Sequence, residues 1–250
     1  MKTDLEIAQA KLLRKLQGKM NECCKQYSLL EDGDRILVGL SGGKDSLAMV
    51  ELLGRRAKIY VPRFHVIAVH VRVQDRAYLS DTIYLESFCR KWGVEFMVKD
   101  TQISSDPTRD KPKDPCFLCS WYRRKVLFDL AQELQCNKIA LGHHKDDAVT
   151  TAIMNLTFQG RFDTIYPSLQ MEKMPLRLIR PLYTIDEADI RRYAELCGYE
   201  KQKALCPYEH ESSRSAVKPI IEQMLMLNAN AKESMLNAIL RMNGSAGGII

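Results

Sequence analysis

A glycine-bearing segment with the sequence SGGKDS constrains the fold of this chain more than any other feature. It comprises Ser41, Gly42, Gly43, Lys44, Asp45 and Ser46. A short apolar run rich in branched side chains precedes it, which is typical of a buried strand, and a helix-like run at residues 47–53 follows it. Glycines let successive backbone N–H groups converge, and a helix start adds partial positive charge. The segment is therefore predicted to bind phosphate.

The polar side chains of this loop agree with phosphate binding, with one exception. Lys44 and the hydroxyls of Ser41 and Ser46 favour an anion, whereas Asp45 would repel a bare phosphate. We interpret Asp45 as a magnesium contact or as a residue that holds the loop. The segment is not a Walker A sequence, because an Asp follows Lys44 where that motif has Ser or Thr.

Strand and helix patterns alternate beyond this loop. Apolar runs at residues 64–71, 94–98 and 138–141 predict strands, and residues 80–91, 120–135 and 148–159 predict helices. This alternation predicts an α/β fold with a doubly wound, mostly parallel sheet, whose ligands lie beyond the carboxyl ends of the strands. Glycines at positions 93 and 160 are expected to end two of the helices.

Helical appendages are expected at both ends of the chain. Residues 4–27 form an amphipathic pattern, and residues 217–227 and 231–242 predict two further helices. A capping box at residues 184–187 is expected to open another helix. The predicted domains are an N-terminal helical segment (1–30), a nucleotide-binding domain with the cysteine pair (31–200) and a C-terminal part (201–250). The N-terminal helix favours a homodimer.

The charge balance favours a polyanionic partner. The 250 residues include 37 Lys and Arg against 31 Asp and Glu, a net charge of +6. The first residues lack the apolar core of a signal peptide, and no apolar run approaches membrane-spanning length. A cytoplasmic protein without membrane association is expected. In that compartment the eight cysteines predict metal binding or catalysis and not a disulfide framework.

Three cysteines form the second candidate site. Cys116 and Cys119 have the spacing that lets two thiolates reach one metal, and the basic residues after them favour thiolate. Cys206 lies in another loop and is the expected third ligand. Of the other cysteines, three that lie in or at the ends of predicted helices are expected to be buried apolar groups: Cys89, Cys136 and Cys197.

Three kinds of chemistry fit this set of cysteines. A zinc site would need a fourth ligand, for which His210 is available. A persulfide relay would need two nucleophilic cysteines and no metal. An iron–sulfur cluster on three cysteines would leave one iron open.

A polar segment at the end of the fourth predicted strand is the third candidate region. It contains His143, His144, Lys145, Asp146 and Asp147. The residues either cap the next helix, or position ATP, magnesium or a base. Two further histidines, at positions 65 and 70, alternate along the second strand and are expected to be packed.

The chain resembles the PP-loop ATP pyrophosphatases through its SGGKDS loop, and more narrowly the TtcA-type tRNA 2-thiocytidine synthetases. The second resemblance extends over residues 33–35, the CFLCS segment at 116–120 with its two following arginines, LGHHKDD at 141–147, IRPL at 179–182 and Cys206. These motifs occur in the order and spacing of the family. One departure is Ala148-Val149-Thr150, where the family has Glu or Gln before the threonine.

The resemblance implies a fold of the adenine-nucleotide alpha-hydrolase type and a specific chemistry. ATP with Mg²⁺ would adenylate the C2 oxygen of a cytidine in the tRNA anticodon loop, and sulfur from a cysteine desulfurase or another donor would replace that oxygen. Cys116, Cys119 and Cys206 would hold a 4Fe-4S cluster. The phosphate loop would contact ATP, together with His143, Asp146 and Asp147.

Two other functions fit parts of the sequence. A PP-loop enzyme with another acceptor, such as a uridine or a substrate other than tRNA, would keep the loop and change the second substrate. A zinc-stabilised RNA-binding module would use the cysteines and leave the loop without a role.

Overall fold

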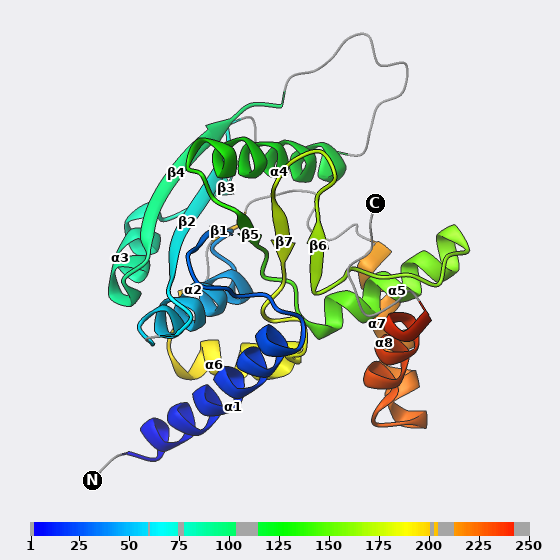
Figure 1. Cartoon of the computed structure of the whole chain (residues 1–250). Coiled ribbons are helices and arrows are strands. Elements are labelled where there is room, and N and C mark those ends of the chain that lie inside the picture. The colour runs from blue at the N-terminus through cyan, green and yellow to red at the C-terminus, as the bar shows by residue number, and fades with distance from the viewer. Residues whose placement is uncertain are drawn as a thin grey trace. The chain divides into compact units, whose positions relative to one another are not determined.

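The computed structural model describes residues 3–59, 61–74, 78–103, 115–200, 203–204 and 213–242 (Figure 1). The backbone divides into two compact units. We call the first, comprising Glu31–Ala140 and Glu200–Glu209, the sheet unit. The second is the helical unit, with Met1–Leu30, Leu141–Tyr199 and His210–Ile250. The domain boundaries expected at residues 30 and 200 remain a prediction.

Four parallel strands form the centre of the sheet unit. They are β1 (Asp34–Gly39), β2 (Phe64–Val73), β4 (Glu95–Thr101) and β5 (Lys138–Ala140), in the spatial order β4-β2-β1-β5. The central strand β1 places Val38 beside Ala68 of β2 and Ala140 of β5. These side chains are buried, as the continuous apolar runs require of a sheet covered on both faces. Two short strands, β3 (Tyr78–Leu79) and β8 (Lys203–Ala204), pair separately in antiparallel fashion.

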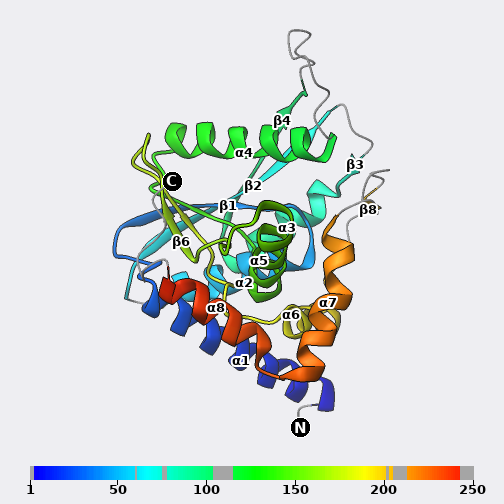
Figure 2. The same cartoon turned by 90° about the vertical axis from the view of Figure 1, so that its right-hand side faces the viewer.

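Helices cover both faces of these strands (Figures 1 and 2). On one face lies α4 (Pro115–Glu133), and on the other lie α2 (Lys44–Ala57) and α3 (Thr82–Trp92). The carboxylate of Asp81 caps α3 by accepting from the Tyr84 N–H, and Gly93 ends the helix in a left-handed conformation with φ of 72°. The predicted α/β, doubly wound, mostly parallel fold is confirmed.

Five helices and a hairpin make up the described part of the helical unit. The hairpin consists of antiparallel β6 (Ser168–Gln170) and β7 (Arg177–Ile179). Helix α1 (Asp4–Gln26) packs on α6 (Glu187–Leu196), with Leu16 and Met20 buried. Helices α7 (Ser213–Leu227) and α8 (Ala231–Met242) pack on α5 (Lys145–Gln159) and on each other. Both predicted appendages are therefore helical.

Several predicted helix starts were wrong, including those of α2 and α7, which begin at Lys44 and Ser213 and not at residues 47 and 217. Helix α4 begins at Pro115 and not at residue 120, because proline suits the first helical position, where no N–H is needed. Helix α5 begins at Lys145 and not at residue 148. The N-cap position of α6 is Asp186 and not Thr184, whose hydroxyl donates to the Lys19 carbonyl at 3.3 Å.

Candidate functional site

The SGGKDS loop connects β1 to α2 at the carboxyl end of the parallel strands. Gly42 has φ of 84°, a left-handed conformation that favours glycine, and Gly43 is the N-cap of α2. Lys44, Asp45 and Ser46 consequently form the first turn of the helix. The loop therefore presents the N–H groups and positive end of a helix, as an anion site requires.

Contacts inside the loop hold its hydroxyls in place. The Ser41 Oγ accepts from the Gly43 N–H at 3.3 Å and lies 3.1 Å from the Ser46 Oγ, which also donates to the Gly43 carbonyl at 2.9 Å. The Lys44 Nζ lies 3.0 Å from the Asp45 carboxylate, and both side chains are less than one-third exposed. A cation, two hydroxyls and a helix start fit a polyphosphate, and a carboxylate beside them fits Mg²⁺.

A buried histidine supports the turn into this loop. His70 of β2 is 1% exposed, and its Nδ1 lies 2.7 Å from the Leu40 carbonyl, which directly precedes the loop. Its Nε2 lies 2.8 Å from the Ser80 hydroxyl. Burial lowers the pKa of His70, which favours the neutral ring. The expected packing is confirmed for His70 but wrong for His65, which is half-exposed beside Glu95.

The cysteine pair lies on a helix and not on the loop expected from the sequence. Cys116 and Cys119 fall in the opening turns of α4, where residues three apart share a face. The Cys119 side chain is partly exposed. The Cys116 side chain and all of Cys206 and His210 lie outside the described residues. Among the described residues no three potential ligands group around a metal position, so the three-cysteine prediction stays a prediction.

Other cysteines behave as apolar core groups. Cys89 in α3 and Cys136 are buried, and burial raises the pKa of both thiols, that of Cys89 to about 12. Thiols with raised pKa values are poor metal ligands and nucleophiles at neutral pH. This confirms the predicted burial of Cys89 and Cys136, whereas the prediction was wrong for Cys197, which is partly exposed.

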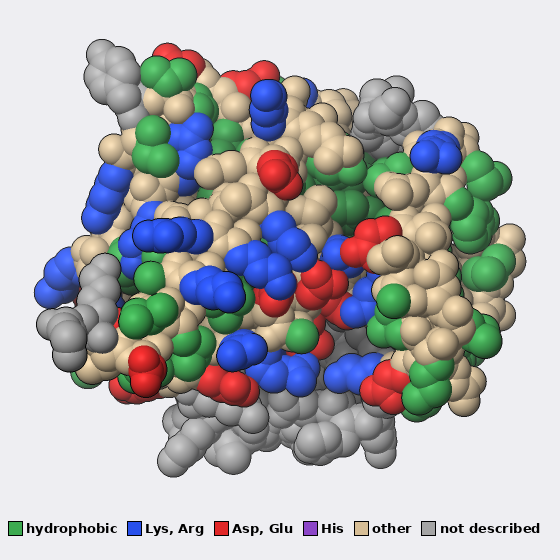
Figure 3. All heavy atoms as spheres, turned by 90° about the horizontal axis from the view of Figure 1, so that it is seen from below, with side chains coloured by type: hydrophobic (Ala, Val, Ile, Leu, Met, Phe, Trp, Pro, Cys, Tyr) green, Lys and Arg blue, Asp and Glu red, His purple; other side chains and the backbone are tan. Residues whose placement is uncertain are grey.

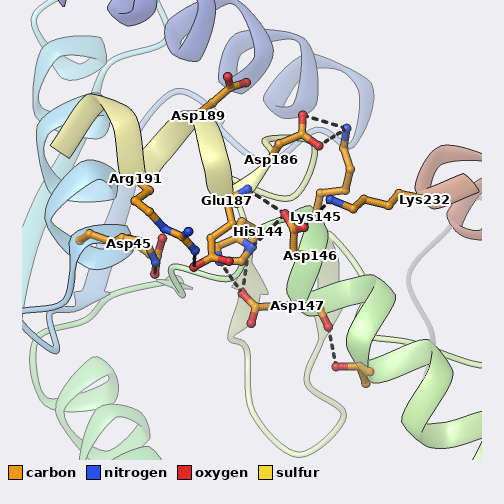
Figure 4. A network of polar contacts seen from close by, with 12 residues as sticks. Asp45, His144, Lys145, Asp146, Asp147, Asp186, Glu187, Asp189, Arg191 and Lys232 are labelled. Atoms are coloured by element: carbon orange, nitrogen blue, oxygen red, sulfur yellow. Dashed lines mark hydrogen bonds and ion pairs between the residues drawn. The ribbon is translucent and has the colours of Figure 1, made fainter. Parts of the chain in front are cut away.

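The HHKDD segment leads into α5 and forms its first turn (Figure 4). The backbone N–H of His144, the N-cap, donates to the Asp147 carboxylate at 3.0 Å. Asp146 accepts from the backbone N–H of Glu187, the first residue of α6, at 2.7 Å. The predicted capping of the next helix is therefore confirmed for Asp147, whereas Asp146 binds an N–H group of α6 and not of α5. The Nδ1 of His143 lies 3.3 Å from the Nε of Arg180.

Lys145 is the centre of a charged network that the sequence analysis did not predict. Its side chain is 8% exposed and contacts Asp186 at 3.1 Å and Glu233 of α8. Burial by itself lowers the pKa of Lys145, but the hydrogen bond to Glu233 and the charge of Asp186 outweigh it and raise that pKa. Lys19 of α1 also contacts Asp186, at 2.8 Å. No local pattern indicates these partners, because they lie far apart in the sequence.

Two arginines that could contact a polyanionic partner, Arg72 and Arg124, differ in their surroundings. Arg72 makes a two-pronged ion pair with Asp100, at 2.7 and 2.8 Å, and Arg124 is exposed on α4. On the face seen from below, Lys and Arg side chains gather among Asp and Glu side chains (Figure 3). In the described part of the chain, no helix has the length and apolar character needed to cross a membrane.

Comparisons with known proteins agree on one family. The PP-loop domain model matches residues 12–203. The chain is 35% identical to a tRNA-cytidine(32) 2-sulfurtransferase of Sorangium cellulosum, covering 91% of this chain and 81% of that protein. For the same enzyme of Paraburkholderia xenovorans the identity is 32%, covering 92% and 68%. Among solved structures, the U34-tRNA thiolase NcsA from Methanococcus maripaludis with its [4Fe-4S] cluster matches with a TM-score of 0.74 at 26% identity, covering 94% of this chain and 79% of that one.

Proposed function

The chain belongs to the PP-loop family and, within it, to the TtcA-type tRNA 2-thiocytidine synthetases, and from this premise we propose that it converts a cytidine of the tRNA anticodon loop to 2-thiocytidine. It is an enzyme, and its family chemistry is tRNA thiolation. The observation that carries the proposal is the loop between β1 and α2, where the backbone of Gly42 and Gly43 and the charge of Lys44 suit a phosphate. The chain that holds this loop is similar to a cytidine sulfurtransferase over nine-tenths of its length.

The phosphate loop accounts for the first half of the reaction. The C2 oxygen of cytidine attacks the α-phosphorus of ATP, the bond to the β-phosphate oxygen breaks, and pyrophosphate leaves. Lys44, the Ser41 and Ser46 hydroxyls and the α2 N–H groups would stabilise the charge on the departing pyrophosphate. Asp45 would contact Mg²⁺ and Lys44 would contact a phosphate oxygen, so the ion pair between these two side chains would break.

The second half replaces the activated oxygen. Sulfur at the oxidation level of sulfide bonds to C2, the C2–O bond breaks, and AMP departs with the original cytidine oxygen. Sulfur delivered as a persulfide would in addition need two electrons from a thiol reductant, which would be oxidised to a disulfide. Cys116, Cys119 and Cys206 would hold a 4Fe-4S cluster, which supplies the sulfur-handling chemistry when bound. The position of the first two on one face of α4 supports this assignment. A cysteine desulfurase or another donor would supply the sulfur, and a homodimer remains our expectation.

The N-terminus of α5 is a second segment that we propose for contact with the nucleotide. It follows β5 after four residues, and ligands of such folds lie beyond the carboxyl ends of the strands. His143 and Asp147 would contact ATP, Mg²⁺ or the cytosine. Asp146 has one oxygen bonded to Glu187 and the other to Lys232, so its contribution would be to hold this turn.

Product analysis of modified tRNA tests this proposal. The anaerobically purified protein, ATP, Mg²⁺, a sulfide source and an unmodified tRNA transcript with a cytidine at position 32 should yield 2-thiocytidine, identified by mass spectrometry of the digested RNA, and release pyrophosphate. Cys119→Ser should abolish the thionucleoside. Formation of 2-thiouridine would instead favour the second candidate, which the similarity to the U34-tRNA thiolase supports.

Metal analysis of the same preparation tests the cluster separately. Iron and acid-labile sulfide with broad, oxygen-sensitive visible absorbance are expected. A colourless protein that holds one zinc, even after reconstitution with iron and sulfide, would overturn the cluster assignment. The affinity for tRNA should fall as salt is raised, because phosphate contacts release counterions.

A further inference from the structure

Two consecutive residues of the C-terminal helix α8 contact two consecutive residues at the start of α5. The Lys232 Nζ lies 2.5 Å from the Asp146 Oδ1, and Glu233 accepts from the Lys145 Nζ (Figure 4). The partners are 86 and 88 residues apart in the sequence. Each helix therefore contributes one cation and one anion, and the two ion pairs form a double contact that we call the α8 clamp.

Burial makes these contacts more consequential than surface ion pairs. The Lys145, Lys232 and Asp146 side chains are 8%, 16% and 21% exposed, whereas Glu233 is 48% exposed. Exposed pairs contribute little to stability, but removing one partner of a buried pair leaves an uncompensated charge in a poorly solvated place. The pair between Lys232 and Asp146 is therefore expected to matter more than the pair with Glu233.

The first turn of α5 is also held by the start of α6. The other Asp146 oxygen accepts from the backbone N–H of Glu187 at 2.7 Å, and Lys145 contacts Asp186 at 3.1 Å. Both residues belong to the start of α6. With Asp146 and Lys145 each joined to α6 and α8, the orientation of the turn is set by both helices.

We propose that Lys232 and Glu233 of α8 are positioning residues for the nucleotide reaction, which act by fixing the turn that carries His143 and Asp147. This inference rests on the proposed function, since it assigns those two side chains to the nucleotide site. A displacement of about 1 Å in a positioned group can lower a rate by about 100-fold. Helix α8 is anchored independently by its buried Leu236 and Ile239, which makes it a stable support.

The kinetics of clamp variants test the proposal. In the full-length, cluster-loaded protein, Lys232→Met should lower kcat for tRNA-dependent pyrophosphate release at least about 10-fold, and Glu233→Gln less, both with unchanged tRNA affinity. Lys232→Arg keeps the charge and should stay within about threefold of the wild type. Lys218→Gln, which alters an exposed lysine of α7, should have no effect.

A packing variant separates positioning from stability. Leu236→Ala weakens the attachment of α8 without touching the clamp, so it should lower Tm by several degrees and leave kcat within about twofold below that temperature. Wild-type kcat in Lys232→Met would overturn the proposal. So would an equal loss of kcat in Leu236→Ala, since α8 would then act through stability alone.

Amide hydrogen exchange provides a readout that needs no substrate. The Glu187 N–H should exchange faster in Lys232→Met, because its acceptor Asp146 loses a partner, and at the wild-type rate in Lys218→Gln. If wild-type protein releases no pyrophosphate, the proposed function fails. In that case hydrogen exchange of the Glu187 N–H still tests whether the α8 clamp holds Asp146 in place. A wild-type exchange rate in Lys232→Met would contradict the clamp.

Discussion

The two ends of the parallel strands in the sheet unit hold their polar groups in different ways. At the amino end, Lys138 of β5 and Asp34 of β1 form an ion pair at 2.7 Å with both side chains 2% exposed. At the carboxyl end, the Lys44 and Asp45 side chains are more than one-quarter exposed and pair with each other across one peptide bond. The first arrangement joins two strands, whereas the second joins neighbours in sequence.

The surroundings of the two pairs extend this difference. Asp34 also accepts from the Glu31 N–H at 2.6 Å and from the Asn137 amide at 2.7 Å, and Lys138 donates to Glu31. A buried charge is tolerated when it is satisfied in this way. The loop pair has solvent and ligand as alternative partners. The amino end is therefore expected to carry stability, and the carboxyl end to carry chemistry.

Removal of the buried lysine should give the largest effect on stability. Lys138→Met leaves Asp34 buried without its cation, so the free energy of unfolding should fall by about 3–5 kcal/mol in urea titrations. Arg90→Met, which breaks an exposed pair with Glu86 in α3, should change it by no more than about 0.5 kcal/mol. A small effect at Lys138 would remove the contrast between the two ends.

The loop lysine should show the opposite pattern. Lys44→Met should lower the rate of pyrophosphate release by about 100- to 1000-fold, because a charge that stabilises the departing group is lost. Its unfolding midpoint should stay close to that of the wild type. Lys58→Met, at the far end of the same helix, is the control and should keep full activity. A large loss of stability in Lys44→Met would contradict the division of roles.

The glycine of the loop should give an intermediate effect. Gly42 has φ of 84°, and an L side chain in that conformation costs about 1–2 kcal/mol, so Gly42→Ala should lower the free energy of unfolding by that amount. Gly18→Ala provides a control of opposite sign, since position 18 lies inside α1 with open space around it. There alanine should stabilise the protein by about 0.5–1 kcal/mol. Equal effects at both glycines would show that the loop backbone is not constrained.

Local features of the sequence were sufficient to predict the loop and most elements. Gly42 and Gly93 were predictable because each adopts a left-handed backbone conformation that favours glycine. Strands β1 and β2 were predictable because the strands of buried parallel sheets consist of continuous apolar runs. The capping role of Asp147 was also recognisable, because a polar group at the start of a helix is a local signal.

Contacts between distant residues were not predictable in the same way. Lys145 and Asp146 looked like part of a polar turn, and the start of α5 was placed three residues too late. The residues that hold them, Asp186, Lys232 and Glu233, lie 41 to 88 positions away. Lys138 likewise looked like the polar end of a strand, although it is fully buried. In each case tertiary packing determines the role of a charge.

A pH titration of stability should give the smallest effect and tests the support of the loop by His70. Burial lowers the pKa of His70 in the folded protein, so near its ordinary value of about 6.5 the unfolded chain binds more protons. The contribution to stability is therefore complete above that pH and is lost as the pH falls through the folded-state pKa. The slope that one proton can produce is at most about 1.4 kcal/mol per pH unit.

The comparison of variants isolates this contribution. Urea midpoints measured from pH 7.5 to 5 should fall more steeply for the wild type than for His70→Gln, which has no titrating ring beside Leu40. His65→Gln, at the half-exposed histidine of the same strand, should retain the wild-type slope. An identical slope in the wild type and His70→Gln would mean that His70 takes up a proton without cost. The carboxyl end of β2 would then be more accessible to solvent than a 1% exposed ring implies.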